Sequence, residues 1–397
     1  MIKIAILGLG TVGTGVAKVI GENGKQIERK LGEPLQVKAI LVRHFKDGPY
    51  RQLMTDDFRK IEEDPEIRVV VETIGGVEAA YEYTKRALSA GKHVVTANKQ
   101  LVAEKGCELL ELAAKKNVRY LFEASVGGGI PVLHPIRECL AANRIEEIYG
   151  ILNGTTNYIL TRMARTGAFF TDALREAQAK GYAEADPSAD IYGIDAGRKI
   201  CILADLAFGR QVLPEKVPME GISKLSLRDV KIAERAGYRI KLLGRTLRMP
   251  GGGRTAYVAP HLVPEDGPLA NVEDVFNAIV VRGNAAGEVM FYGRGAGEMP
   301  TASACVSDVI EAVSRTAGEE EPLWTEDASG FVDPKELHTR FYFRIEGSLT
   351  DAAMAFGQVE VLSEDGETAF LTDRISGTAA EEQSDNLNVL ACMRVLN

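Results

Sequence analysis

The sequence predicts an α/β fold: a doubly wound parallel sheet of the Rossmann type, followed by an α+β domain with a mixed sheet and by a small C-terminal α+β domain. Three observations predict it. The chain opens with a strand, a glycine-rich turn and a helix; strands and helices then alternate as far as Glu123; and from about His134 apolar strands are joined by Gly- and Pro-rich turns, notably Pro250 to Gly253.

Length, charge and hydropathy exclude several classes of protein. With 397 residues the chain can form two or three domains with substantial cores. Its net charge of −9 argues against nucleic acid or an anionic membrane as a partner. No stretch approaches the roughly 18 apolar residues of a membrane span. The opening residues, MIKIAILG, read as a strand and not as a signal peptide, so we expect a cytoplasmic protein.

Cysteine and histidine are too dispersed to indicate a disulfide framework or a zinc site. The five cysteines are odd in number and have no paired spacing, which favours reduced thiols: Cys107, Cys139, Cys201, Cys305 and Cys392. The five histidines are equally scattered.

The first strand, Ile2 to Leu7, is followed at once by Gly8, Gly10 and Gly13 and by a helical segment to about Ile20. In this context the GxGxxG pattern predicts a dinucleotide site, because glycines let the backbone approach a pyrophosphate and the helix N-terminus meets its charge. The alternative is a merely tight turn.

The second strand, Gln36 to Val42, ends in Arg43, His44 and Lys46. An NAD-selective protein is expected to place an acid there for the ribose hydroxyls, whereas basic groups suit a 2′-phosphate. The pattern therefore favours NADP. NAD as a second cofactor and a merely solvated basic loop remain open.

Further strand and helix pairs continue the alternation. Thr73 and Lys99 fall at carboxyl ends of strands, the edge that faces the ligand in such sheets. Lys99 is then able to reach the cofactor or substrate, or it lies in solvent at a helix N-terminus. The expected elements are a strand from Arg68 to Ile74, a helix to Ala90, a strand from His93 to Ala97, a helix to about Lys115, and a strand from Val118 to Glu123.

The run EASVGGGIP, from Glu123 to Pro131, places three glycines in a row. Such a run suits a close cofactor approach, a hard cation held by main-chain oxygens, or a plain flexible turn. A second cluster, Gly293, Gly295 and Gly297, precedes a helix from Pro300 to about Thr316. That helix either packs back on the nucleotide domain, with Gly297 near the cofactor, or begins a linker.

The strands of the second domain are expected at Ile145 to Leu152, Ile240 to Met249, Arg254 to Leu262, Ala278 to Val281 and Val289 to Tyr292. After the acidic run Glu319 to Glu321, a small third domain is expected, with a strand at Arg340 to Glu346, a helix at Asp351 to Phe356 and a strand at Thr368 to Thr372. The final stretch is too polar to place.

The segment from Ala177 to Lys199 is the strongest candidate for chemistry. Thr171 is the expected N-cap of a helix to about Lys180, Gly181 its stop, and Asp195 the start of a second helix through Phe208. This leaves three acids on the loop between the helices: Glu184, Asp186 and Asp190.

Asp195 and Lys199 share one helix face at i, i+4 spacing, and the apolar run after Lys199 predicts a buried helix. A lysine placed beside a carboxylate in a buried helix is suited to proton transfer. A structural ion pair is the equal alternative. A divalent metal is disfavoured, because the acids lack the spacing of an EF-hand loop.

Taken together, these residues resemble homoserine dehydrogenases over essentially residues 1 to about 316. The most specific match is the set Ala177, Gly181, Tyr182, Asp186-Pro187, Asp190, Gly193, Asp195 and Lys199. The runs ILNGTTNYIL from Ile151, TANK from Thr96, and GAG with PTA from Gly295 also match.

The resemblance implies NAD(P)-dependent interconversion of L-homoserine and L-aspartate 4-semialdehyde in threonine and methionine biosynthesis. It implies that Lys199 is the general acid/base and Lys99 a second essential lysine, and that Gly181, Glu184 and Asp195 bind substrate. It implies contacts to the dinucleotide from Gly10, Thr11, Val12, Gly13, Arg43, Thr73, Lys99 and Gly297, and a sodium or potassium site at Glu123, Val126, Gly128 and Ile130.

The resemblance also implies a homodimer and three domains: 1–133 completed by 297–316 for the dinucleotide, 134–296 for catalysis and dimerisation, and 320–397 as an ACT-like domain. The tail departs from the family, since Phe341 to Ala355 lacks the Pro-Gly pair of an effector loop, so it is expected to be a diverged ACT-like domain without support for threonine feedback. The alternatives are a nucleotide-sensing regulatory protein and another amino-acid-pathway dehydrogenase; no cysteine here has the setting of a nucleophile.

Overall fold

The computed structural model describes residues 1–314, 322–327 and 329–396. The chain forms two compact units. Unit 1 comprises Met1–Ala142, Cys201–Pro214 and Gly293–Asp327, and unit 2 comprises Asn143–Ile200, Glu215–Tyr292 and Ala328–Asn397. The helix α10, Ile194–Phe208, belongs partly to each.

Unit 1 contains a six-stranded sheet in the order β3-β2-β1-β4-β5-β6, with parallel pairing throughout. This is the strand order of dinucleotide-binding folds, and it confirms the predicted Rossmann-type sheet. The strands are β1 Ile2–Leu7, β2 Leu35–Leu41, β3 Met54–Thr55, β4 Ile67–Glu72, β5 His93–Thr96 and β6 Tyr120–Leu121.

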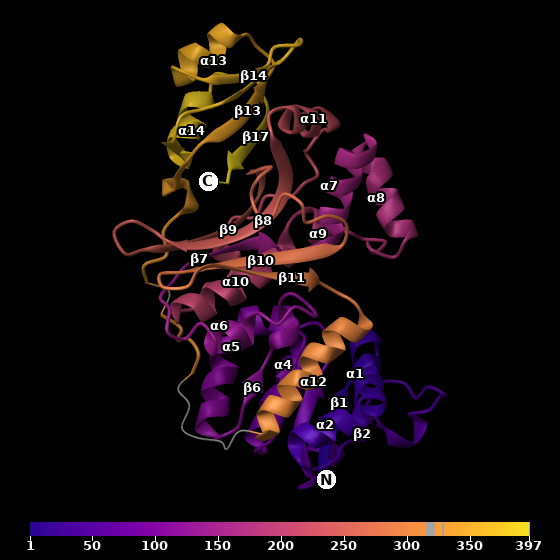
Figure 1. Cartoon of the computed structure of the whole chain (residues 1–397). Helices are drawn as coiled ribbons and strands as arrows, with labels where there is room; N and C mark the ends of the chain where they lie inside the picture. Colours follow the sequence, from indigo (N-terminus) through magenta and orange to yellow (C-terminus); the bar gives the residue numbers. More distant parts are fainter. Residues whose placement is uncertain (315–321, 328, 397) are drawn as a thin grey trace. The chain divides into compact units, whose positions relative to one another are not determined.

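The helices of unit 1 cover this sheet. After Gly297 the chain returns to unit 1, which is the first of the two alternatives left open for this helix: α12 packs on α1 so closely that a Cβ at Gly15 would lie 2.9 Å from the Ala302 Cβ (Figure 1). The helices are α1 Thr11–Glu22, α2 Gly24–Leu31, α3 Arg59–Glu62, α4 Glu78–Ser89, α5 Lys99–Lys115, α6 Leu133–Arg137 and α12 Glu298–Ser314.

Unit 2 is built on a nine-stranded mixed sheet in the order β11-β10-β7-β8-β9-β17-β13-β15-β14. Its first five strands are β7 Ile145–Ile151, β8 Tyr238–Arg248, β9 Arg254–Pro264, β10 Phe276–Gly283 and β11 Gly287–Arg294. They form antiparallel pairs where β7 meets β8 and β10 and where β8 meets β9, as predicted. The helices beside them are α7 Gly154–Thr166, α8 Phe170–Ala179, α9 Ser188–Ile191 and α11 Leu227–Arg235.

The C-terminal segment has the order β13 Phe341–Ile345, α13 Leu349–Phe356, β14 Glu360–Ser363, β15 Thr368–Leu371, α14 Gly377–Ser384 and β17 Val389–Val395. This is a βαββαβ unit around a small aromatic core that includes Phe343 and Phe370. Its strand β17 pairs with β9 at two positions, so the segment continues the sheet of unit 2. A separate two-stranded sheet joins β12 His338–Thr339 to β16 Ile375–Ser376.

Some local predictions were wrong. The N-cap of α8 is Phe169 and not Thr171, and Asp190 lies in the short helix α9 and not on a loop. The strand expected at Val118 to Glu123 shortens to β6, because Glu123 turns the chain through a 3₁₀ helix. Thr316, Gly318 and Glu319 to Glu321 lie outside the described residues. Among the described helices, none combines the length with the apolar composition that a membrane span requires.

Candidate functional site

The turn between β1 and α1 requires glycine. Gly8 has φ of 95°, and a Cβ at Gly13 would lie 2.1 Å from the Gly8 carbonyl oxygen. Thr73, at the end of β4, fastens this turn: its Oγ1 donates to the carbonyl oxygens of Leu7 at 2.9 Å and Gly8 at 3.1 Å. Thr73 therefore holds the main chain of the glycine turn.

The same turn leaves room for a ligand at the start of α1. Gly10 and Thr11 are exposed, Val12 is half-buried, and a Cβ at Gly10 would meet nothing within 4 Å. The first amides of a helix have no partner within the helix, so they attract a phosphate. Arg43 lies exposed just beyond β2. These residues fit a dinucleotide.

Two further predicted residues lie at helix starts of unit 1. Lys99 is the first residue of α5, which is capped by the Asn98 side chain accepting from the Leu101 amide at 3.1 Å, and Lys99 is half-buried. Gly297, with φ of 130°, directly precedes α12. The buried Glu72 orders this edge of the sheet, since Thr96 Oγ1 donates to its Oε2 at 2.6 Å.

The segment predicted to bind a cation is a compact turn. The buried Glu123 carboxylate accepts from the main-chain amides of Val132 at 2.5 Å and His134 at 2.6 Å. Burial raises the pKa of Glu123 more than these bonds lower it. Val126 and Ile130 are buried, and Gly128 has φ of 58°. A Cβ at Gly128 would lie 2.5 Å from the Gly295 carbonyl oxygen, so this backbone conformation and packing require glycine.

In unit 2 the predicted pair of Asp195 and Lys199 is formed. Lys199 Nζ donates to Asp195 Oδ2 at 2.7 Å and to the Leu152 carbonyl oxygen at 2.7 Å. Lys199 is 8% exposed and Asp195 7%. Leu152 directly follows β7, so the end of a central strand fixes the amine. The lysine is held by one charged and one neutral acceptor, a geometry that suits proton exchange.

The loop after β7 adds a residue that the sequence did not reveal. Asn153 Nδ2 donates to Asp190 Oδ1 at 2.7 Å and to Asp195 Oδ2 at 2.9 Å. Burial and the negative charge of Asp195 raise the pKa of Asp190, whereas the hydrogen bond from Asn153 and the positive charge of Lys199 lower it. Burial is the largest of these effects, so the pKa of Asp190 is raised. Asn153 was thus missed as a site residue, and its only sequence signal was the run ILNGTTNYIL at a junction of strand and helix. Asp190 was named among the acids of the candidate segment, but no role was assigned to it.

Gly181 and Glu184 lie on the exposed connection between α8 and α9. Gly181 has φ of 72° and ends α8 as predicted, and the Glu184 carbonyl oxygen accepts from Gln178 Nε2 at 3.1 Å. Thr155 Oγ1 donates to the Tyr182 carbonyl oxygen at 2.7 Å, which attaches this connection to α7. Within the described part of the chain, the Glu184 carboxylate forms no hydrogen bond or ion pair with Lys199.

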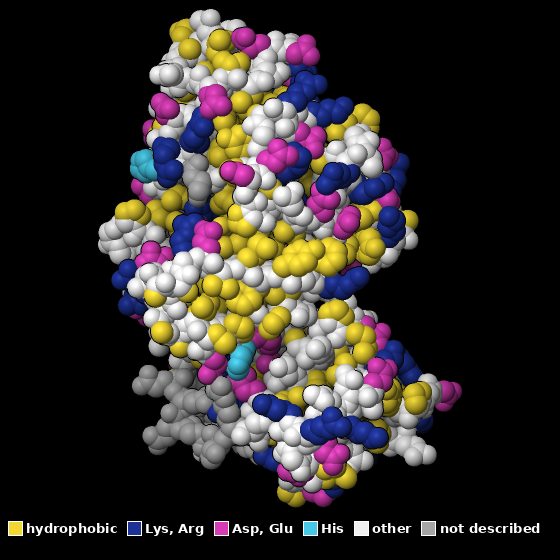
Figure 2. Space-filling view, in the orientation of Figure 1, with side chains coloured by type: hydrophobic (Ala, Val, Ile, Leu, Met, Phe, Trp, Pro, Cys, Tyr) yellow, Lys and Arg dark blue, Asp and Glu magenta, His cyan; other side chains and the backbone are white. Residues whose placement is uncertain are grey.

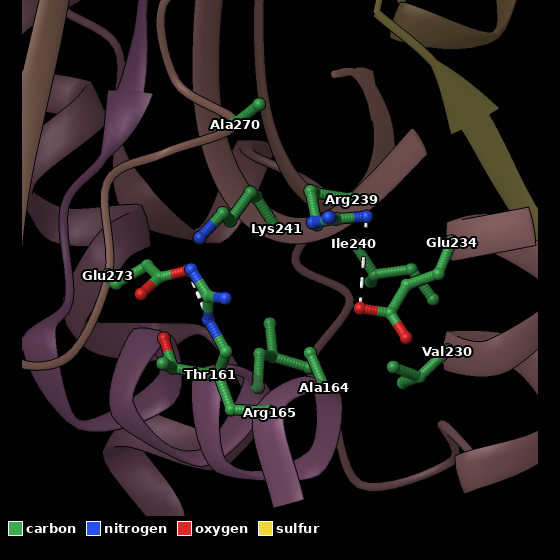
Figure 3. A pocket seen from close by; sticks show the side chains of 11 residues that line it. Thr161, Ala164, Arg165, Val230, Glu234, Arg239, Ile240, Lys241, Ala270 and Glu273 are labelled. Carbon is green, nitrogen blue, oxygen red and sulfur yellow. Dashed lines mark hydrogen bonds and ion pairs between the residues drawn. The ribbon is translucent and has the colours of Figure 1, made fainter. Parts of the chain in front are cut away.

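A pocket of unit 2 lies further along α7 (Figure 3). Lys241 points into it beside the ion pair of Arg165 and Glu273, and its Nζ donates to Asn157 Oδ1 at 3.1 Å and to the Val272 carbonyl oxygen at 2.5 Å. Lys241 is 4% exposed, and burial lowers its pKa to about 8.

The parallel sheet, its glycine turn and the buried lysine–carboxylate pair define a nucleotide-dependent oxidoreductase. Two family models match the chain: "Homoserine dehydrogenase, NAD binding domain" over residues 8–123 and "Homoserine dehydrogenase" over residues 131–310. A homoserine dehydrogenase of Neisseria gonorrhoeae is 48% identical over 316 residues, which is 78% of this chain and 72% of that protein.

Solved structures agree. A homoserine dehydrogenase from Thiobacillus denitrificans superposes with a TM-score of 0.92 at 37% identity, over 100% of this chain and 98% of that one. A hyperthermophilic archaeal homoserine dehydrogenase in complex with NADPH superposes with a TM-score of 0.66 at 31% identity, over 78% and 97%. The chain belongs to the homoserine dehydrogenase family and is an NAD(P)-dependent enzyme, not the sensing protein considered as an alternative.

Proposed function

We propose that Lys199 is the general acid/base with which this homoserine dehydrogenase interconverts L-homoserine and L-aspartate 4-semialdehyde. The observation that carries this is the buried Nζ held between Asp195 Oδ2 and the Leu152 carbonyl oxygen. The bound nicotinamide supplies or accepts the hydride. In the reducing direction the Lys199 ammonium gives a proton to the aldehyde oxygen as the carbon becomes an alcohol carbon. In the oxidising direction the amine takes the hydroxyl proton back.

Asp195 and Glu184 are proposed to meet the ammonium group of the substrate, with Gly181 beside them. Carboxylates suit that group, and a buried Asp195 that already accepts from Lys199 is fixed in place. Lys99 is proposed to contact cofactor and substrate from the start of α5. These proposed contacts assign a substrate-binding role to each of the predicted residues.

The test is the loss of NADPH absorbance with aspartate semialdehyde as substrate. Lys199→Met is expected to lower kcat by about 10²–10⁴-fold, the usual contribution of a general acid. Lys231→Met, which changes an exposed lysine of α11, is the matched control and should retain the parent kcat. Parent-like turnover by Lys199→Met, with the control also active, refutes the assignment.

We propose that the dinucleotide is held by Gly10, Thr11, Val12 and Gly13 at the start of α1, with Thr73 and Gly297 beside them, and that Arg43 favours NADP. An exposed guanidinium after β2 suits a 2′-phosphate. Arg43→Ala should lower kcat/KM for NADPH at least tenfold more than for NADH. The two cofactors act as mutual controls in one variant, and equal losses contradict the 2′-phosphate role.

A monovalent cation, sodium or potassium, is proposed at Glu123, Val126, Gly128 and Ile130, mostly through main-chain oxygens. Support comes from the left-handed Gly128 and from the type of ligand, since hard cations prefer oxygen. The test is activity after dialysis into choline chloride, followed by sodium or potassium chloride at constant ionic strength. An unchanged rate in all three salts counts against the site.

A homodimer is proposed through the edge strand β11. Its Met290 and Tyr292 are 44% and 52% exposed, and Figure 2 shows hydrophobic side chains gathered over β10 and β11. An uncovered apolar edge strand invites pairing. Light scattering should give twice the chain mass for the parent and one chain mass for Met290→Asp.

We also propose that the enzyme works in the cytoplasm, and that its domains follow the three predicted ranges.

A further inference from the structure

Asn153 lies at the centre of the polar cluster of unit 2. Its Nδ2 has two hydrogens, and each has a carboxylate within reach: Asp190 Oδ1 at 2.7 Å and Asp195 Oδ2 at 2.9 Å. Asn153 is 5% exposed. Both amide hydrogens are thus used inside the protein, between two acids that come from different helices.

The carbonyl oxygen of the Asn153 side chain forms separate hydrogen bonds that fix the orientation of the amide. Asn153 Oδ1 accepts from the Thr156 amide at 2.8 Å and from Thr156 Oγ1 at 3.0 Å, which makes Asn153 the N-cap of α7. A flipped amide would aim its NH₂ at the Thr156 amide and its oxygen at two carboxylates, so only one orientation satisfies all partners.

Without the Asn153 amide between them, the carboxylates of Asp190 and Asp195 would compete for the ammonium group of Lys199. Asp195 Oδ2 accepts from both Lys199 and Asn153, so the amide fixes the oxygen that in turn fixes the amine. Among the described residues Asp190 forms no ion pair, and the Asn153 amide donates to it at 2.7 Å. The amide therefore does two jobs: it aims Asp195 and it stabilises the charged form of Asp190.

We propose that Asn153 is a positioning residue of the dehydrogenase reaction, which holds Asp195 on Lys199 and orients Asp190 toward a cationic group of the substrate. This rests on the proposed role of Lys199 as the general acid/base. Asn153 itself exchanges no proton. It acts through the two acids that its amide joins.

The structure offers variants that separate this role from helix capping. Asn153→Ser keeps an N-cap oxygen for α7 and loses both amide hydrogens. Asn153→Asp keeps the shape and the cap, and puts a third carboxylate against Asp190 and Asp195. The control for plain cap loss is Ser376→Ala at α14, where Ser376 Oγ accepts from the Ala379 amide at 3.1 Å.

We expect Asn153→Ser to lower kcat about 10–100-fold, with a melting temperature within a few degrees of the parent. The acid limb of kcat/KM should move to higher pH, because the amide that lowers the pKa of Asp190 is gone. The acid limb should move further in Asn153→Asp, where three carboxylates share one site. Ser376→Ala should lower the melting temperature and leave kcat and the pH profile unchanged.

The experiment distinguishes failure of the Asn153 inference from failure of the proposed role of Lys199. If Lys199→Met is inactive while both Asn153 variants keep the parent kcat and acid limb, Asn153 is only a helix cap and this inference is overturned. If Lys199→Met is active, the proposed proton donor is wrong. Should Asn153→Ser fail to fold, Asn153→Asp, the closest match in shape, decides the question by the same two measurements.

Discussion

Asp229 and Arg344 form a bidentate ion pair in unit 2. Arg344 Nε lies 2.7 Å from Asp229 Oδ1, and Nη2 lies 3.0 Å from Oδ2. Asp229 is 0% exposed and also closes the capping box of α11 with Ser226. One carboxylate therefore joins the start of α11 to the strand β13, 115 residues further along the chain.

Removing Arg344 should destabilise unit 2 strongly. Arg344→Met leaves Asp229 buried without its counterion, which typically costs about 3–5 kcal/mol of unfolding free energy. Urea unfolding measures this loss, with Arg340→Met as the control, since Arg340 pairs with the exposed Glu360 and donates to the Thr372 carbonyl oxygen but leaves no buried carboxylate without a counterion. Equal effects of the two variants would show that the Asp229 contact contributes little.

The same pair predicts an acid dependence of stability. Burial acts to raise the pKa of Asp229, but the hydrogen bonds from Arg344 and Ser226 outweigh it, so the pKa is lowered. A lowered folded-state pKa gives stability that is present above the unfolded value of about 3.9 and is lost as pH falls through the folded value. Asp229→Asn should lose this dependence below about pH 4, as unfolding at pH 2–6 would measure.

Lys241 predicts a second rise of stability with pH, in the alkaline range. Its pKa of about 8 in the folded state lies below the unfolded value of about 10.4, so the unfolded chain binds more protons between these values. Stability relative to Lys241→Met should therefore rise by about 3 kcal/mol from pH 8 to pH 10.5. Lys231→Met is the exposed control. If the difference in unfolding free energy between the parent and Lys241→Met stays constant over this pH range, the lowered pKa of Lys241 is contradicted.

Gly13→Ala should impair the glycine turn, because the new Cβ would lie 2.1 Å from the Gly8 carbonyl oxygen. We expect a loss of about 1–3 kcal/mol and at least tenfold weaker NADPH binding. Gly21→Ala, in the same helix with nothing within 4 Å of its Cβ, should instead gain about 0.5–1 kcal/mol and bind normally. Calorimetry and NADPH titration measure both quantities.

Glu123→Gln tests the anchor of the turn after β6. The carboxylate accepts three main-chain amides, from Val132, Leu133 and His134, and an amide side chain brings a donor where only acceptors fit. We expect a loss of about 1–3 kcal/mol in denaturant unfolding. Glu111→Gln, which breaks an exposed i, i+4 pair with Lys115, should change stability by less than about 0.5 kcal/mol.

Much of unit 1 was predictable because parallel strands buried on both faces appear as short apolar runs, and the helix α5 begins at Lys99 as expected. The pair of Asp195 and Lys199 was predictable from i, i+4 spacing within α10. Both inferences need only neighbours along the chain.

Asn153 was not predictable in the same way, because its partners Asp190 and Asp195 lie 37 and 42 residues away and only the folded chain brings them together. The strand β17 was missed for a related reason. Its first three residues are half-buried and only Met393 and Val395 are buried, so burial does not alternate along the whole strand, and its strand conformation depends on pairing with β13 and β9. Long-range hydrogen bonds of this kind leave no local periodicity to detect.

The position of β17 also limits how the C-terminal segment can move. The strand is an interior member of the nine-stranded sheet, with main-chain partners on β9 at one side and on β13 at the other. A displacement of β13 is therefore coupled to β9 through the main-chain hydrogen bonds of β17, which has five paired positions on the β13 side and two on the β9 side.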